Sequence, residues 1–180
     1  MRILDRDNGI PAVLLMAYGS PNSLDEVADY LSEVRGGRGS SLDDVEHLKN
    51  RYQRVGGRTP LLQITKAQSE ALEKKLVAEG LPARVSYGMK HWHPFIEDVV
   101  EKVDLDNPSA LIGLALAPHY SKLSIGGYED SVRRAASADV RTSPSGSPVA
   151  PGTVLRWGDK PLRKERVTLI ELHYDIQRIV

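Results

Sequence analysis

The chain has 180 residues, of which 41 % are apolar and 27 % are charged, which is typical of a globular domain and excludes disordered and fibrous classes. Its 24 basic and 24 acidic residues give a formal net charge of zero, which argues against a nucleic-acid partner bound through net charge. The absence of cysteine excludes disulfide scaffolds, thiolate metal sites and cysteine nucleophiles, and it fits the reducing cytoplasm, where we expect the chain to be located. We expect no membrane span, because the longest apolar stretches are far shorter than the roughly 20 residues that a spanning helix needs.

Strands and helices are predicted to alternate along the chain. Two continuous apolar runs, Ala12–Tyr18 and Leu111–Ala117, predict strands that are buried on both faces, and a shorter strand is predicted over 83–87. Apolar residues at helical spacing predict helices over 24–34, 42–55, 60–79, 95–103 and 128–136. The alternation predicts an α/β fold with an open, mostly parallel sheet and flanking helices.

Three sequence signals predict where the first helices begin. Ser23 and Glu26 have the spacing of a capping box. Ser41 is a candidate N-cap of the second helix, and Thr59 followed by Pro60 is a candidate start of the third.

The composition changes near Asp139, where a Ser/Pro/Gly-rich segment begins. We therefore predict an N-terminal α/β domain over 1–139, followed by a linker and an irregular C-terminal tail over 140–180. Within this tail only Val167–Leu172 has the pattern of a strand or short helix.

Candidate functional residues follow the predicted strands, where open α/β sheets place their ligands. Tyr18 ends the first strand and is either a half-buried packing residue or a hard oxygen ligand of the kind that holds iron. His91 and His93 are either metal ligands on an extended segment or residues at a strand end and a helix start, and His119 is a lone strand-end histidine.

Five arginines lie near the ends of two predicted helices: Arg35, Arg38, Arg51, Arg54 and Arg58. They are either solvated cations favoured by the helix dipole or a rim that binds carboxylates or phosphates. Known nucleotide-binding glycine motifs and the hydrolase nucleophile elbow are absent from the sequence.

Several motifs, taken together and in order, resemble the N-terminal half of ferrochelatases over about residues 10–136. They are Met16-Ala17-Tyr18-Gly19-Ser20-Pro21, Arg51-Tyr52 with Gly56-Gly57-Arg58-Thr59-Pro60-Leu61, Gly88-Met89-Lys90-His91, and Leu116-Ala117-Pro118-His119-Tyr120-Ser121 with Tyr128. The resemblance implies a chelatase-like half-domain and an enzyme of haem biosynthesis, a lyase that inserts ferrous iron into coproporphyrin III to give Fe-coproporphyrin III. The tyrosine in the first motif resembles the coproporphyrin-using branch, and the alternative substrate is protoporphyrin IX.

The resemblance also implies roles for individual residues. Tyr18 would approach the inserted iron axially, and the porphyrin and its propionates would be contacted by Tyr18, Arg35, Arg51, Tyr52, Thr59 and Tyr128. His91 and His119 would be cleft groups. Ferrous iron and porphyrin would be substrates, with no tightly bound cofactor.

The family's second half carries a histidine and a glutamate that handle iron and pyrrole protons, and neither is recognisable in residues 137–180. We therefore identify no catalytic residue in this chain and expect a shortened family member. A non-catalytic porphyrin-binding fragment is the alternative.

Overall fold

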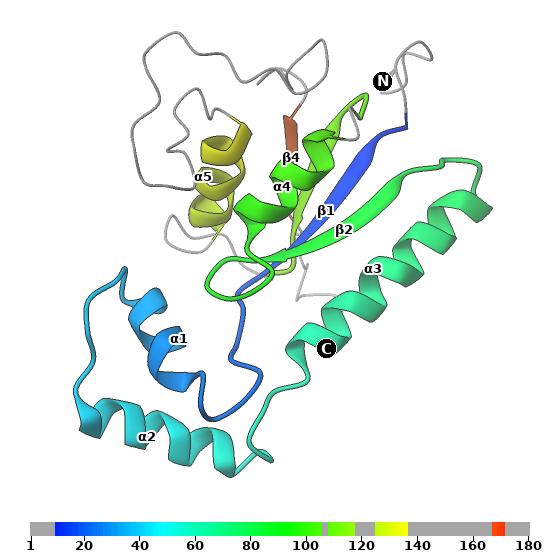
Figure 1. Ribbon diagram of the computed structural model, residues 1–180. Coiled ribbons are helices and arrows are strands. Elements are labelled where there is room, and N and C mark those ends of the chain that lie inside the picture. The colour runs from blue at the N-terminus through cyan, green and yellow to red at the C-terminus, as the bar shows by residue number, and fades with distance from the viewer. Residues whose placement is uncertain (1–9, 106–107, 118–124, 137–166, 172–180) are drawn as a thin grey trace, which may run out of the picture.

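The computed structural model describes residues 10–105, 108–117, 125–136 and 167–171. Their core is a sheet of four parallel strands in the order β2-β1-β3-β4 (Figure 1). The strands are β1 (Ala12–Ala17), β2 (Arg84–Met89), β3 (Leu111–Ala115) and β4 (Val167–Glu171). The predicted α/β fold with an open parallel sheet is confirmed.

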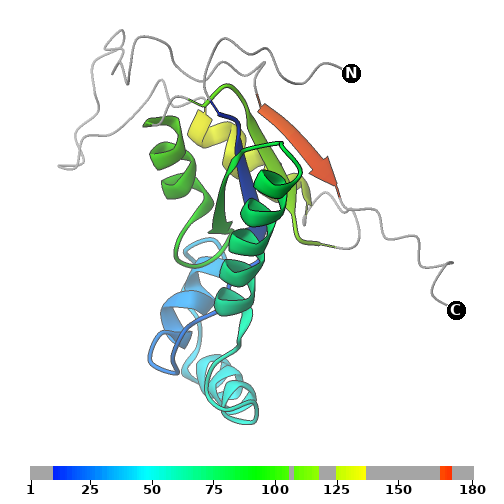
Figure 2. The same cartoon turned by 90° about the vertical axis from the view of Figure 1, so that its right-hand side faces the viewer.

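Helices cover both faces of this sheet (Figure 2). On one face α4 (Ile96–Leu105) and α5 (Ile125–Ala136) pack against β1 and β3, and on the other face α3 (Leu61–Ala78) packs beside β2 and β1. The apolar run of β1 is continuous because both faces of this central strand are buried. Leu14 and Met16 pack on the face covered by α4 and α5, and Val13 and Leu15 pack on the face covered by α3.

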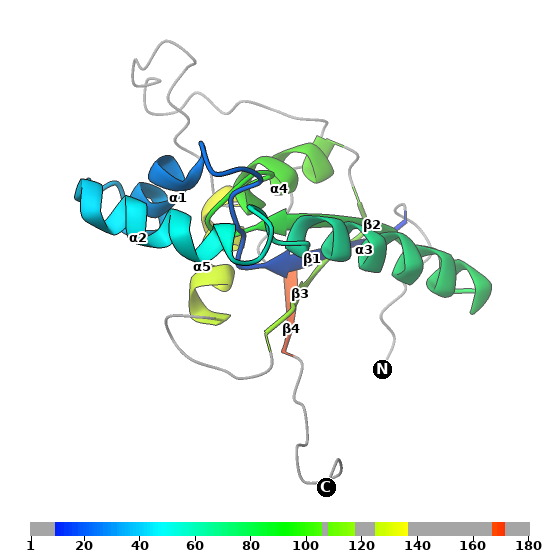
Figure 3. The ribbon, with the colours of Figure 1, turned by 90° about the horizontal axis from the view of Figure 1, so that it is seen from below.

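Two helices stand apart from these layers, beyond the carboxyl ends of the strands (Figures 1 and 3). They are α1 (Val27–Val34) and α2 (Leu42–Gln53), which contact each other. Within α2 no residue is buried, and Leu42 at its start is 86 % exposed. This helical pair therefore extends the carboxyl edge of the sheet rather than its core.

The strand order reverses at β1. The chain passes from β1 to β2 on one side of the sheet and then crosses to β3 on the other side of β1. Sheets of this topology bind ligands at the carboxyl ends of the two strands where the order reverses. The ends of β1 and β3 are therefore the expected position of a site, and β2 ends beside them.

Two of the predicted helix caps are wrong, and tertiary contacts explain both. Helix α1 begins only at Val27, because the carboxylate of Glu26 accepts hydrogen bonds from the backbone N–H of Asn22 (2.7 Å) and the indole N–H of Trp92 (2.9 Å) rather than forming a capping box with Ser23. Helix α3 has Pro60 at its N-cap position, and the hydroxyl of Thr59 is hydrogen-bonded to Ser20.

The predicted N-cap of the second helix is confirmed, because Ser41 accepts a hydrogen bond from the backbone N–H of Asp44 at the start of α2. The tail segment predicted as a strand or short helix pairs with β3 as strand β4, whereas the domain boundary near residue 139 stays a prediction. No helix in the described part of the chain combines the length and apolar character that crossing a membrane requires.

Gly88 tests the packing of β2 against α4. A Cβ at this position would lie 2.9 Å from the Cα of the fully buried Ile96, so the two backbones would have to separate. We expect Gly88→Ala to lower the free energy of unfolding by about 1–3 kcal/mol, the usual range for overpacking a core, as measured by urea denaturation.

Gly39→Ala is the matched control, because a Cβ at Gly39 meets nothing within 4 Å. Equal stability of the two alanine variants would contradict the proposed close approach of β2 and α4.

Candidate functional site

Tyr18 lies where β1 ends, and its side chain is 46 % exposed although the whole strand before it is buried. The loop after β2 runs beside it, because the backbone N–H of Lys90 donates to Ala17 O and that of His91 donates to Tyr18 O, both at 2.9 Å. The rings of Tyr18 and His91 are in contact, with centroids 4.7 Å apart. Two strand ends predicted to carry functional residues therefore meet in one place.

Gly19 allows this meeting of the two loops. Its φ of +98° lies in the left-handed region, and a Cβ there would be 2.9 Å from the backbone nitrogen of Trp92. The hydroxyl of Tyr30 donates to Gly19 O at 3.2 Å, which ties the turn to helix α1. Tyr30 was not among the predicted site residues, and its helical position in the sequence carries no signal of this contact.

Three partly buried phenol groups near this turn have raised pKa values. Burial raises the pKa of Tyr30, with further contributions from the nearby Tyr52 and Tyr18 hydroxyls. Burial also raises the pKa of Tyr52, although the neighbouring Tyr30 hydroxyl and the charge of Arg51 oppose the shift. Burial and then the neighbouring Tyr18 raise the pKa of Tyr128 to about 12. Tyr52 therefore lies close to Tyr30 and Tyr128 lies close to Tyr18, while the porphyrin contacts that the resemblance implied stay a prediction.

Lys90 is a second residue of the site that the sequence predictions missed. Its ammonium nitrogen lies 5.6 Å from the centroid of the Tyr128 ring, a cation–π distance. Burial lowers the pKa of Lys90, as does the nearby Arg134, while Asp130 opposes the shift. Its position directly before His91 at a strand end was the available signal.

The predicted arginine rim is only partly assembled. Arg35 at the end of α1 donates from Nη1 to Asp44 (3.0 Å) and to Ser40 (3.2 Å), and it thereby joins α1 to α2. This guanidinium, and then the Ser41 hydroxyl, hold the pKa of Asp44 below its usual range. Arg51 lies exposed in the last turn of α2, directly before Tyr52.

The remaining predicted residues divide into three cases. Thr59 is hydrogen-bonded to Ser20 at 2.6 Å, which places it beside the turn after Tyr18. His93 is exposed, and its ring contacts Trp92 and Phe95. No group of three or more potential metal ligands exists among the described residues, so the metal interpretation of His91 and His93 gains no third ligand there. His119 lies outside the described residues.

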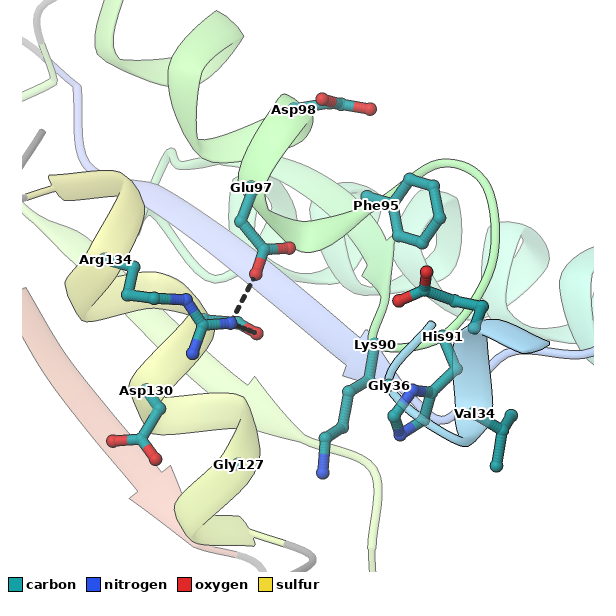
Figure 4. A pocket seen from close by; sticks show the side chains of 12 residues that line it. Val34, Gly36, Lys90, His91, Phe95, Glu97, Asp98, Gly127, Asp130 and Arg134 are labelled. Carbon is teal, nitrogen blue, oxygen red and sulfur yellow. Dashed lines mark hydrogen bonds and ion pairs between the residues drawn. The ribbon is translucent and has the colours of Figure 1, made fainter. Parts of the chain in front are cut away.

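A cavity of about 520 Å³ adjoins this site on the side of His91 (Figure 4). It lies between the end of α1, the loop after β2, and helices α4 and α5. Its charged walls include Lys90, Glu97, Asp130 and Arg134, and Arg134 donates to Glu97 at 2.8 Å.

His91 gives the site a measurable pH dependence. Burial, and then the charge of Lys90, lower its pKa from 6.5, while Glu97 opposes the shift. The folded protein therefore takes up a proton less readily than the unfolded chain, so stability should fall as the pH decreases from 6.5 toward the folded pKa.

We expect NMR titration to show His91 titrating below 6.5, and Lys90→Met to shift that titration upward because one repulsive charge is removed. As the pH decreases from 6.5 toward the folded pKa of His91, the free energy of unfolding should decrease less in His91→Gln than in the wild type. A His91 titration at or above 6.5 would rule out the depressed pKa of this half-buried imidazole.

Comparison with known proteins points to one family. The ferrochelatase family model matches residues 11–151. A ferrochelatase from Herpetosiphon aurantiacus is 55 % identical over 126 residues, which are 69 % of this chain. A ferrochelatase from Deinococcus radiodurans is 40 % identical over 68 % of this chain, and a coproporphyrin III ferrochelatase from Geobacillus kaustophilus is 38 % identical over 83 % of it.

The matched regions make up 41 %, 39 % and 46 % of these three relatives, so the chain spans less than half of their length. The family match includes the site described above, from the turn at Tyr18 through Lys90 and His91 to Tyr128. The chain belongs to the ferrochelatase family.

Proposed function

We propose that this chain forms a porphyrin-binding wall of a coproporphyrin III ferrochelatase, a lyase that inserts ferrous iron into coproporphyrin III. The observation that carries the proposal is the exposed ring of Tyr18 at the reversal of strand order, in contact with His91 and surrounded by protonated phenols. An exposed aromatic ring of this kind suits a flat macrocycle. The names of several relatives, including the one from Geobacillus kaustophilus, support coproporphyrin III as the substrate.

The residues around Tyr18 supply groups for the four carboxylates of this porphyrin. Guanidinium and hydroxyl groups are the donors that carboxylates prefer, and we assign this role to Arg35, Arg51, Tyr52, Thr59 and Tyr128. Arg51 is exposed and can reach a substrate directly, whereas Arg35 would exchange Asp44 for a substrate carboxylate. Tyr128 is only 3 % exposed, so its contact would be limited to the atoms at that surface.

Metal insertion replaces two pyrrole N–H protons with one ferrous ion. In our proposal the macrocycle lies against Tyr18, whose phenol oxygen would approach the metal along the axis of the ring. A neutral His91 beside it does not repel the incoming dication, as an imidazolium would. Because the family's proton-accepting histidine and glutamate are not recognisable in this chain, we assign it the porphyrin-holding step.

The proposal is tested by titrating the purified full chain with coproporphyrin III and with protoporphyrin IX, with and without ferrous iron under anaerobic conditions. Shifts of the Soret band report binding, and the change in the visible bands reports metallation. We expect coproporphyrin III to bind more tightly than protoporphyrin IX, without metallation by this chain alone. Tighter binding of protoporphyrin IX would favour the alternative substrate, and binding of neither would refute the proposal.

Arg51 tests the role of the carboxylates. We expect Arg51→Ala to weaken coproporphyrin III binding about fivefold, the size expected for one exposed ion pair, and to change the binding of a porphyrin with two carboxylates less. Lys74→Ala is the matched control, because it removes an exposed cation from the C-terminal half of α3, which lies far from the carboxyl ends of the strands (Figure 1). Equal losses for both porphyrins would contradict a carboxylate contact of Arg51.

A further inference from the structure

Gly127, in the first turn of α5, lies against the side chain of Lys90. A Cβ added at Gly127 would overlap the Lys90 ammonium nitrogen and lie 2.7 Å from Lys90 Cε. Only a residue without a side chain therefore leaves room for this ammonium beside the helix backbone. Figure 4 shows Lys90 reaching from the loop after β2 toward Gly127 across the wall of the cavity.

The ammonium held there has a defined electrostatic surrounding. It lies over the ring of Tyr128, which is itself close enough to Tyr18 for the two phenols to influence each other. Arg134 and His91 are further basic groups on this wall, and part of the charge of Arg134 is compensated by Glu97 at 2.8 Å. Asp130 of α5 is an acidic group that favours the charged form of Lys90.

We infer that Gly127 is a positioning residue, which seats the Lys90 ammonium beside Tyr128 so that it pairs with one carboxylate of the porphyrin. This inference rests on the proposed function for the identity of the anion. A macrocycle in contact with Tyr18 and His91 would extend over the next residue, Lys90, where a carboxylate finds a partly desolvated cation. Ion pairs in such surroundings are less screened than those on an open surface.

Substitution of Gly127 should disturb this arrangement without unfolding the protein. The atoms that a new methyl group would meet belong to the end of a long, flexible side chain, which can move away at little cost. Gly127→Ala therefore displaces Lys90 toward water, and Lys90→Met removes its charge. Gly39→Ala is the control for a glycine substitution in open space.

The first experiment is a double-mutant cycle with coproporphyrin III and the full chain. We expect Gly127→Ala and Lys90→Met each to weaken binding about fivefold, and the double variant to bind no more weakly than Lys90→Met. The same substitutions should weaken the binding of a porphyrin with two carboxylates less. Unchanged affinity in Gly127→Ala, or additive losses in the double variant, would overturn the inference, because a merely structural glycine would act independently of Lys90.

The second experiment needs no porphyrin and separates this inference from the proposed function. NMR of the lysine side chains should show Lys90 titrating below the ordinary value in the wild type and in Gly39→Ala, and closer to that value in Gly127→Ala. If Gly127→Ala leaves the titration unchanged, Gly127 does not seat Lys90. If the titration shifts but the wild type binds no porphyrin, the seat is real and the carboxylate role fails together with the proposed function.

Discussion

The close approach of the two loops after β1 and β2 is the constraint on which the site depends. Backbone hydrogen bonds from Lys90 and His91 to the end of β1 bring these loops together, and the positive φ of Gly19 lets the turn pass the backbone of Trp92. A side chain at Gly19 would push the loops apart and separate Tyr18 from His91. The chemistry of the site therefore follows from a backbone contact that one glycine permits.

Burial determines which groups near this contact carry charge. The phenols of Tyr30, Tyr52 and Tyr128, on three different helices, are partly or largely withdrawn from water, and burial raises the pKa of each. Burial also disfavours the charged form of His91. The result is one exposed aromatic ring, Tyr18, beside a half-buried imidazole and largely buried phenols, with the charge of Lys90 next to Tyr128.

The sequence predicted the parts of the fold that local patterns determine. Continuous apolar runs identified β1 and β3 because both faces of each strand are covered, and Ser41 was a correct cap because its partner is three residues away. Glu26 was misread because its partner Trp92 is far away in the sequence. The buried Thr65 and Ser69 of α3 were missed for a different reason: each donates to a carbonyl of its own helix, so these small polar side chains are buried without an unpaired hydroxyl.

For the site, the sequence identified the residues at the strand ends but not how they are engaged. Whether Arg35 is free to bind a ligand depends on Asp44, which lies on the next helix and holds the guanidinium in the described structure. Both side chains remain accessible to water, and ion pairs of this kind contribute little to stability. A substrate carboxylate could therefore replace Asp44 at small cost, and α1 and α2 would lose only one of the contacts that join them. In the proposed function, Arg35 would thus be recruited by exchange, whereas the buried Tyr128 and the seated Lys90 are already in position.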